Sequence, residues 1–444
     1  MKKILILACA MLFAAPSLFS QSLINENVWL RKIERSDSDI ANPKKSGKAS
    51  TWINRGETFY GAATEISKYL YEGVSAEEVI MSLGQPTAAE VVTIGGRSLN
   101  KGVFEYADVY LDELNIPVSW EVTKEIYPGA LAKAAEAYSK AYEIDGQNAK
   151  TAQKVQEGLK NIYDAYSKTG ASYYMLAKYD KAAASFINAY EISKLPGVTI
   201  PDTDVQTLLH DAGISFFFAG DAQNSVKYLT MAEEIGYHDA DIYYLIYHAY
   251  RDLGGRDALE TAKAYLEKGL AQYPTDAQIL ESISEAYVLL GEDPGEVLSK
   301  VEAAVNEDPK NPDMWSALGV LYSNGGDYDK AIDAFEHMVE LIPDSYIANN
   351  NLGLSYIKKA EVILDELNAQ AAKFSTQAEY DAEKMKAFAV YAQAVPYLEK
   401  AHSIDPSNAA TLEILKNVTF RIREMDGMQA KYEKYDAELK ALNK

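Results

Sequence analysis

The side chains that could carry chemistry in this chain do not form a catalytic or metal-binding pattern. Its five histidines are scattered along 444 residues: His210, His238, His248, His337 and His402. Neither a His-Glu-x-x-His sequence nor two histidines one helical turn apart occurs, so the spacing predicts no metal site. His210 is followed by Asp211, which could complete a metal-binding pair, but a histidine on a helix surface is the simpler interpretation.

The acidic residues, the glycines and the cysteine give no catalytic site either. Asp and Glu recur at helix-surface spacing, and no pair stands out as a general acid and base. Gly95-Gly96-Arg97 is predicted to be a hairpin turn, because no Gly-Lys-Ser/Thr sequence of a phosphate-binding loop follows it. Cys9 is the only cysteine and lies in an N-terminal leader, so we expect no thiol chemistry after export. We therefore predict that the chain is not an enzyme and holds no cofactor or metal ion.

Composition and charge narrow the class of partner. Apolar residues make up 48% of the chain and charged residues 24%, which allows a substantial buried core. The net charge of -22 at pH 7 disfavours nucleic acid and anionic lipid, and suits basic partners or plain solvation. One segment is an exception: from Arg31 to Arg55, seven Lys or Arg residues outnumber three Asp or Glu residues.

The first residues have the composition of an export signal. Two lysines precede the apolar stretch Ile4–Phe13, Pro16 follows, and the serines up to Ser20 suit a cleavage site. We expect residues 1–20 to be a secretory signal peptide. A lipoprotein signal ending at Cys9 is the less favoured alternative, because the apolar stretch before it is short. No later apolar run reaches the roughly 20 residues that a membrane-spanning helix needs.

A repeat of 34 residues supplies the helices that would position a binding surface. Its clearest copy, between Asn311 and Ser345, contains Trp315, Leu318, Gly319, Tyr322, Gly326, Tyr328, Ala331, Phe335 and Pro343. Gly319 is expected to let two antiparallel helices approach closely, with Phe335 packing back onto the first helix. This spacing resembles the tetratricopeptide repeat, and the resemblance implies helix-turn-helix units stacked as an α-solenoid.

The resemblance continues without a gap from Asn161 to Pro343 and implies a mainly α protein. We expect an N-terminal helical segment at 21–71 and the solenoid at 127–444. The first repeat is unusual, because the residues around Tyr138 look like a second helix whose first helix is missing immediately upstream. A candidate for that missing helix lies far back, with suitable mutual spacing: Trp52, Gly56 and Phe59.

The frame is interrupted again after Tyr356. The expected second helix, around Leu398, arrives about 29 residues late. The residues between, at about 357–395, keep helical periodicity and predict a long helical hairpin with a turn near Ser375–Gln377. Pro396 is expected to kink or restart its second helix. A polar C-terminal helix pair would then cap the array.

Residues 72–126 break the helical pattern and predict an inserted α+β module. Ser75 and Glu78 form a capping box for a short helix, and the alternation after it predicts a three-stranded antiparallel meander. Gly73-Val74-Ser75, Glu78-Val79 and Leu83-Gly84-Gln85-Pro86, followed by strands, resemble the small module of outer-membrane assembly lipoproteins of the SmpA/BamE type. That resemblance implies an envelope setting. An ordinary β insertion decorating the first repeat is the alternative.

In tetratricopeptide arrays the first helices of successive repeats line a concave groove, so the resemblance implies a set of groove-facing residues. They are His210, Phe217, Tyr244, His248, Arg251, Glu281, Glu285, Asn350 and Asn351. Aromatic and polar groups together suit an extended peptide or a partner helix. Arg251 is the only cation in the set, so the carboxylate clamp that holds chaperone tails is not expected. Plain solvent exposure is the competing interpretation for each residue.

We therefore expect a protein–protein interaction scaffold that binds a peptide or partner protein through the groove, the hairpin or the inserted module. The chain resembles periplasmic tetratricopeptide proteins of Gram-negative bacteria, which makes the periplasm the expected location. Association with the outer membrane and secretion are the alternatives. A carrier for a small envelope ligand, such as a glycan or peptidoglycan fragment, is the competing function. We expect no nucleic-acid partner and no stable membrane span, and the oligomeric state is left open.

Overall fold

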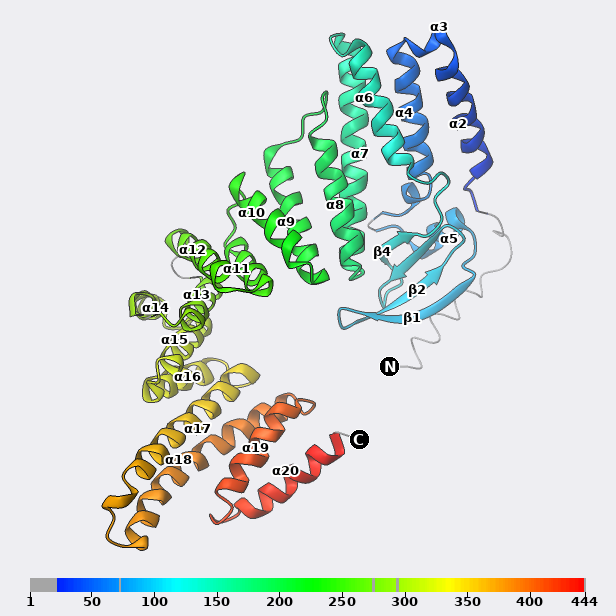
Figure 1. Cartoon of the computed structure of the whole chain (residues 1–444). Helices are drawn as coiled ribbons and strands as arrows, with labels where there is room; N and C mark the ends of the chain where they lie inside the picture. Colours follow the sequence, from blue (N-terminus) through cyan, green and yellow to red (C-terminus); the bar gives the residue numbers. More distant parts are fainter. Residues whose placement is uncertain (1–21, 72, 274–275, 293–294, 443–444) are drawn as a thin grey trace. The chain divides into compact units, whose positions relative to one another are not determined.

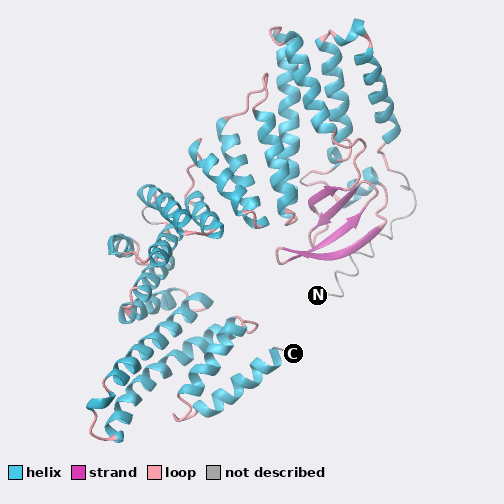
Figure 2. Cartoon of the chain, in the orientation of Figure 1, coloured by secondary structure: helices cyan, strands magenta, loops and turns pink. Residues whose placement is uncertain are grey.

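The computed structural model of the chain is mainly helical, with one small β-sheet near its N-terminal end (Figure 2). It describes residues 22–71, 73–273, 276–292 and 295–442, so the predicted signal peptide lies outside the described residues. The chain divides into two compact units, one up to Leu253 and the other from Gly254 onward, and each is considered by itself. Within the described part, no helix is both long and apolar enough to cross a membrane.

The first unit consists of antiparallel helix pairs interrupted once by the sheet (Figure 1). Its helices are α2 (Glu26–Ala41), α3 (Pro43–Ser46), α4 (Ala49–Thr64), η1 (Ser67–Tyr69), α5 (Ala76–Leu83), α6 (Ala130–Asp145), α7 (Ala149–Met175), α8 (Tyr179–Ser193), α9 (Asp202–Ala219), α10 (Ala222–Glu234) and α11 (Asp241–Leu253). Helix α4 pairs with α6, α7 with α8, and α9 with α10, and each pair contacts the next helix along the chain.

The first repeat is split by the inserted module. Helix α4, which carries Gly56, packs against α6, which carries Tyr138, although 65 residues lie between Thr64 and Ala130. A Cβ atom at Gly56 would lie 2.7 Å from the ring of Tyr138, and one at Gly158 of α7 would lie 2.2 Å from it. The tyrosine ring therefore fills the space between two helices that lack side chains there. Gly56 and its neighbours supply the missing first helix, as the spacing predicted.

The module contains four strands, not the three that the alternation predicted. They are β1 (Ala88–Ile94), β2 (Arg97–Val103), β3 (Ala107–Leu111) and β4 (Pro117–Val122), antiparallel in the order β1-β2-β3-β4. A tight turn separates β2 from β3, and the Phe104 backbone N–H donates to the Ala107 carbonyl at 2.9 Å across it. Alternation continues through this turn, so the pattern alone concealed it. Gly95 and Gly96, at φ 55° and 77°, close the predicted β1–β2 hairpin.

Hydrogen bonds and ion pairs join strand β4 of the sheet to the end of α7 and the start of α8. The hydroxyl group of Ser172 accepts from the Trp120 backbone N–H of edge strand β4 at 3.2 Å and also bonds the Trp120 carbonyl. Glu121 of β4 is buried and forms ion pairs with Lys178 and Lys181. Because these contacts satisfy the edge strand and pair its buried charge, the module is integrated into the first unit.

The second unit repeats the helix-pair pattern. Its helices are α12 (Arg256–Gln272), α13 (Ala277–Leu290), α14 (Gly295–Glu307), α15 (Pro312–Asn324), α16 (Tyr328–Leu341), α17 (Tyr346–Ala369), η2 (Ala371–Lys373), α18 (Gln377–Ile404), α19 (Ala409–Arg421) and α20 (Met428–Leu442). Successive helices contact one another from α12 to α20, apart from the short η2. With the first unit, this confirms the predicted mainly α fold built of antiparallel helix pairs.

Close helix crossings show the repeat register directly. A Cβ at Gly319 would lie 2.7 Å from Phe335, which follows it by 16 residues. Gly170 with Phe186 and Gly213 with Leu229 have the same spacing and an equally close approach, at 2.6 Å each. Gly353 meets Leu398 instead, 45 residues on, again at 2.6 Å. The 29 additional residues between them form the extensions of α17 and α18.

Those extensions pack on each other and turn at residues 370–376. The turn ends in a capping box, in which the Glu379 backbone N–H donates to the Thr376 hydroxyl group. Helix α18 then runs through Pro396 without a break, so the predicted restart at this proline is wrong. Val395 and Leu398 on either side of it are buried, and their packing offsets the backbone hydrogen bond that proline cannot make.

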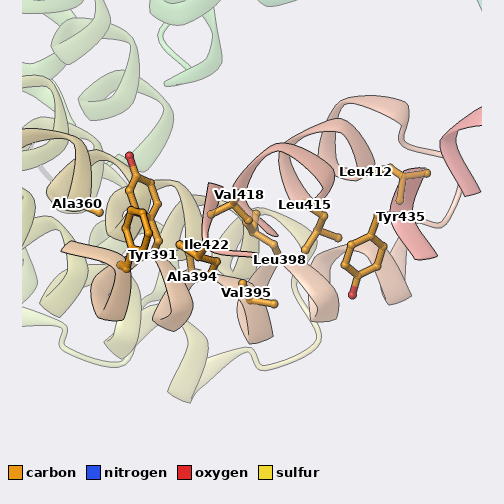
Figure 3. Packing of buried hydrophobic residues seen from close by; sticks show 11 residues of the cluster. Ala360, Tyr391, Ala394, Val395, Leu398, Leu412, Leu415, Val418, Ile422 and Tyr435 are labelled. Carbon is orange, nitrogen blue, oxygen red and sulfur yellow. The ribbon is translucent and has the colours of Figure 1, made fainter. Parts of the chain in front are cut away.

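The C-terminal helices share one core (Figure 3). Ala360 of α17, Tyr391 and Leu398 of α18, Leu415 of α19 and Tyr435 of α20 are all buried in it. The last helix therefore contributes a large aromatic side chain to the core, while most of its remaining surface is exposed. This arrangement matches a capping helix, which must bury one face only.

Neighbouring repeats of the second unit are joined by a recurring hydrogen bond. Tyr287, Tyr322 and Tyr356 each donate a hydroxyl hydrogen to the glutamate 20 residues earlier, on the second helix of the preceding pair. The tyrosine-to-carboxylate distance is 3.2 Å at Glu267 and 2.7 Å at Glu336. The bond repeats at the period of the helix pairs, so it belongs to the stacking of the array.

Candidate functional site

Three of the predicted groove residues are brought together in the first unit. The ring of His248, on α11, lies 6.5 Å from that of Phe217 on α9 and 6.2 Å from that of Tyr244. Arg251, one turn further along α11, lies 5.8 Å from the Tyr247 ring and 3.8 Å from the Asp252 carboxylate. Two successive first helices thus place their predicted side chains side by side.

Further aromatic rings extend this group toward α7 and α8. Phe217 contacts Phe218 at 5.5 Å, and Phe218 stacks on Tyr179 at 5.2 Å. Tyr174 meets both Tyr179 and Phe218 edge to face, at 5.5 and 6.2 Å. We call the resulting continuous row the aromatic strip; it consists of Tyr174, Tyr179, Phe217, Phe218, Tyr244 and His248.

The aromatic strip is open to solvent at Phe218, in the middle of the row. Phe218 is 51% exposed, and Met175, which follows Tyr174 at the end of α7, is 53% exposed. Side chains of this size are normally covered, and an exposed ring within a row of other rings marks an interaction surface more often than a lone exposed residue does. The aromatic strip therefore offers apolar area together with the tyrosine hydroxyl groups.

The local sequence explains why these rings point outward. Three consecutive phenylalanines lie in the last turn of α9, just before Ala219. The first of them, Phe216, stacks on Tyr228 of α10 at 5.5 Å. Successive residues on a helix point about 100° apart, so Phe217 and Phe218 turn away from that contact. Gly220, at φ 79°, then caps the helix in a left-handed conformation. Tyr179 is the first residue of α8, and its ring stacks on that of Phe218.

Acidic groups flank the aromatic strip. Asp180 follows Tyr179 in the first turn of α8 and is exposed. Burial raises the pKa of Tyr174, and the neighbouring Tyr179 and Asp211 raise it further. Asp252 lies beside Arg251 on α11. Asp252 is thus paired with a cation, whereas the exposed Asp180 beside Tyr179 favours apolar segments carrying positive charge.

His210 was predicted to face the groove, but it is buried and cannot meet a ligand. Its ring stacks on Tyr237 at 4.2 Å, and its Nε2 lies 3.1 Å from Asp241 Oδ2, although the two are not aligned as a hydrogen bond. Burial lowers the pKa of His210, but the Asp211 and Asp241 carboxylates outweigh it and raise the pKa to about 9. The buried imidazolium of α9 therefore interacts with Asp241, the first residue of α11, and so links the two helices.

The predicted carboxylates of the second unit lie on one helix. Glu281 and Glu285 are four residues apart on α13, which places them on the same face. Glu281 reaches solvent, yet partial desolvation raises its pKa, and the carboxylates of Glu285 and Asp313 raise it further. Three acidic groups thus gather on α13 and the first turn of α15.

The two predicted asparagines of α17 are partly buried. The Oδ1 atom of Asn350 is covered and, among the described contacts, accepts no hydrogen bond. Asn351 uses its backbone carbonyl to accept from the Ser355 hydroxyl group at 2.9 Å. Both asparagines belong to the second unit and the aromatic strip to the first, so the predicted residues of each unit are described by themselves.

Sequence reasoning missed Tyr174, Tyr179 and Phe218. The repeat frame treats Tyr179 as a structural position and gives no role to the other two. One signal was nevertheless present, because Phe216, Phe217 and Phe218 are consecutive. The frame requires only one apolar residue to pack inward there, so the extra phenylalanines had to face elsewhere.

No group of three or more His, Cys, Asp or Glu residues in the described ranges could hold a metal ion.

Residues 312–345 match the family model of the tetratricopeptide repeat. The PEX5-related protein of Mus musculus is 33% identical over 89 residues, or 20% of this chain and 13% of its own length. Superkiller complex protein 3 of Mus musculus is 23% identical over 236 residues, or 44% of this chain and 14% of its own.

The chain thus spans only a small part of the curated relatives it matches. Among solved structures, YrrB, described as a tetratricopeptide protein with an unusual peptide-binding site, is 19% identical. The similarity covers 48% of this chain and 96% of YrrB, with a TM-score of 0.32. The family match and the helix pairs together identify the chain as a helical repeat protein that carries a tetratricopeptide repeat at residues 312–345.

Proposed function

We propose that this chain is a protein-interaction scaffold of the bacterial cell envelope, and that the aromatic strip binds a segment of its partner. The observation that supports the proposal is the continuous row of rings across α7, α8, α9 and α11, in which Phe218 is 51% exposed. Tetratricopeptide repeats are protein-interaction modules, and their stacked helices present extended surfaces.

The chemistry of the aromatic strip favours a protein segment with apolar anchors and basic residues. Buried aromatic and arginine side chains dominate binding energy in protein interfaces, and Phe218 and Tyr179 offer such anchors a stacked pair of rings. Asp180 and the overall charge of -22 favour basic residues beside those anchors. The segment is expected to be extended or helical, because the rings follow a line across successive helices.

Site-specific photocrosslinking tests this proposal. A photoreactive phenylalanine analogue is placed at position 218 and, as a matched control, at position 420 of the second unit, where Phe420 is 46% exposed. Irradiation of cells that export the chain should give a discrete protein adduct at position 218 that is absent at position 420. The absence of any adduct at 218, or the same adducts at both positions, would contradict the proposal.

A glycan or peptidoglycan fragment is the competing ligand, because sugars also stack on exposed aromatic rings. Thermal melting separates the two, since a small ligand at one hundred times its Kd stabilises its protein by about 2.7 kcal/mol. The scaffold proposal expects no shift with envelope glycans. A shift that Phe218→Ser removes and Phe420→Ser leaves intact would assign the aromatic strip to a carrier instead.

The envelope location rests on the leader, which lies outside the described residues. Its two lysines, apolar stretch and following serines have the order of a secretory signal, and the periplasm of a Gram-negative cell is the location proposed. Fractionation of cells expressing the full chain, or the chain lacking residues 2–20, tests this. Export of both forms, or retention of both in the cytoplasm, would contradict it.

A further inference from the structure

The first described helices carry a cationic surface that the proposed partner site does not use. Its side chains are exposed on α2, on α3 and just before α4. We call this surface the cationic face; it consists of Arg31, Lys32, Arg35, Lys44 and Lys48. In a chain with a net charge of -22, such a local excess of positive charge needs an explanation.

The cations of this surface form no ion pair within the described part of the chain, although the exposed Glu34 precedes Arg35 on the same helix. Lys45 pairs with Asp39 at 2.6 Å and Arg55 with Asp37 at 2.7 Å. Among the described residues, however, no carboxylate lies within ion-pair distance of any member of the cationic face. Lys32 instead lies over the Trp29 ring at 4.0 Å, and Arg31 donates to the backbone carbonyl of Asn27 at 3.1 Å.

Helix α2 presents these cations away from the array. Among its residues only Ile33 is buried, and the helix contacts its neighbours α3 and α4. Arg31 and Arg35 are four residues apart, so they lie on one side of the helix. Val28, one turn earlier, is 38% exposed, and Leu23, just before the helix, is 60% exposed. The helix thus combines outward charge with exposed apolar side chains at its start.

We propose that the cationic face docks the protein on an anionic phospholipid surface. Sixteen residues give α2 a length of about 24 Å, and Lys44 and Lys48 continue the positive charge beyond its end. Exposed cations distributed over three successive elements match a plane of lipid phosphates better than they match a single anionic group. Val28 and Leu23 can enter the interface beside the headgroups. No helix among the described residues spans a membrane, so this contact is peripheral.

The acidic remainder of the chain does not oppose such docking at physiological salt. Exposed charges are largely screened beyond about 8 Å at an ionic strength of 0.15 M. Each Lys or Arg near an anionic surface contributes about 1 kcal/mol, so the local excess decides the binding. Weak, salt-sensitive attachment is therefore expected, and the aromatic strip is left free for its own partner. This inference does not depend on the proposed function.

Vesicle flotation with two matched variants tests the proposal. The patch variant is Arg35→Glu, Lys44→Glu and Lys48→Glu; the control variant is Lys150→Glu, Lys168→Glu and Lys310→Glu, which are exposed cations elsewhere with the same total charge change. Full-length protein is floated with phosphatidylcholine vesicles and with vesicles in which about three lipids in ten are phosphatidylglycerol. The leader, with its two lysines, is common to all forms, so the difference in the gain on phosphatidylglycerol between the patch variant and the control variant reports the cationic face.

The wild-type chain and the control variant should bind the anionic vesicles more strongly than the neutral ones. The patch variant should lose that gain by about tenfold or more, and about 0.5 M NaCl should remove it from every form. Circular dichroism checks that all three forms are folded. Equal binding to both vesicles, or an equal loss in the control variant, would overturn the proposal. Binding to poly-glutamate but not to vesicles would assign the cationic face to an acidic protein and would also overturn it.

Discussion

At the scale of single residues, small side chains and buried charges set how the helices meet. Glycines at the crossings let a large side chain from the paired helix fill the space, as Phe335 does at Gly319. His210 shows the opposite case, a charged ring held inside by Asp211 and Asp241. The glycine crossing requires a residue without a side chain, and the contacts of His210 require a protonated ring. Each requirement predicts how a substitution or a change of pH alters stability.

Replacing Gly319 tests the register of the tetratricopeptide repeat. The first side-chain atom of a leucine would lie 2.7 Å from the Phe335 ring, so Gly319→Leu should force the helices apart and lower stability by about 1–3 kcal/mol or more. The matched control is Gly325→Ala, because a Cβ there would come no closer than 3.4 Å to its neighbours. Urea unfolding compares the variants, and equal midpoints would show that the assigned crossing is wrong.

His210 predicts how the first unit responds to pH. Its folded-state pKa of about 9 exceeds the ordinary value of 6.5, so its contribution is fully present below pH 6.5 and is lost as pH rises toward 9. The loss amounts to no more than about 3 kcal/mol. Urea midpoints of the wild type and His210→Gln should converge as pH rises through this window. A constant difference between them would contradict the role of the imidazolium.

At the scale of elements, two kinds of contact hold neighbours in register. The tyrosine-to-glutamate bond links successive pairs in the second unit, and Glu121 links the sheet to α7 and α8. The tyrosine-to-glutamate bond is partly exposed and recurs along the array. The ion pairs of Glu121 involve a buried carboxylate and occur at one place. Removing each contact should therefore lower the free energy of unfolding by a different amount, and two sets of substitutions measure the difference.

The tyrosine hydroxyl groups are tested by Tyr322→Phe and Tyr356→Phe. Each change removes one hydrogen bond to a carboxylate and should cost about 1–2 kcal/mol. Tyr328→Phe in the same unit is the control, because its hydroxyl group, although near enough to Lys358 to raise the pKa of that lysine, makes no hydrogen bond to a carboxylate among the described residues. Burial and Glu302 raise the pKa of Tyr322 to about 12, so its stabilisation should decline between pH 10 and 12 and vanish in the phenylalanine variant. Equal stability of all three variants would contradict the account.

Glu121 tests whether the inserted module is part of the first unit. Burial raises its pKa, but the hydrogen bonds from Lys178 and Lys181 outweigh that and hold it below the ordinary value. Glu121→Gln should cost about 1–3 kcal/mol, since both lysines keep some solvent. Glu90→Gln is the matched control, with an exposed carboxylate paired to Lys101, and should change stability by less than about 0.5 kcal/mol. Equal effects would show that the module is only a surface decoration.

Periodicity predicted the helix pairs well because each pair must bury a repeating apolar face. Gly56 and Tyr138 could even be matched across the insertion, since their spacing to other residues follows the repeat. The turn between β2 and β3 could not be seen, because alternation continues through Phe104. His210 was misplaced for a related reason: its position in the repeat faces the groove, but nothing local reveals that Tyr237 and Asp241 cover it. Phe218 was missed because the frame describes inward contacts only.

At the scale of the whole molecule, regular pairs provide the fold and irregular features provide the surfaces. The aromatic strip lies where repeats carry more aromatic residues than packing requires, and the cationic face lies where charge departs from the rest of the chain. The two surfaces use different chemistry, apolar rings in one case and unpaired cations in the other. Variants of one should therefore leave the other intact.

The central claim is that the aromatic strip binds the partner, and affinity measured with matched variants tests it most directly. The segment crosslinked at position 218 is synthesised and titrated against the wild type, Tyr179→Ala with Phe218→Ser, and the exposed-phenylalanine control Phe420→Ser. Loss of two stacked anchor rings should weaken binding by about tenfold or more, while the control should match the wild type. Equal Kd values for all three proteins would contradict the account.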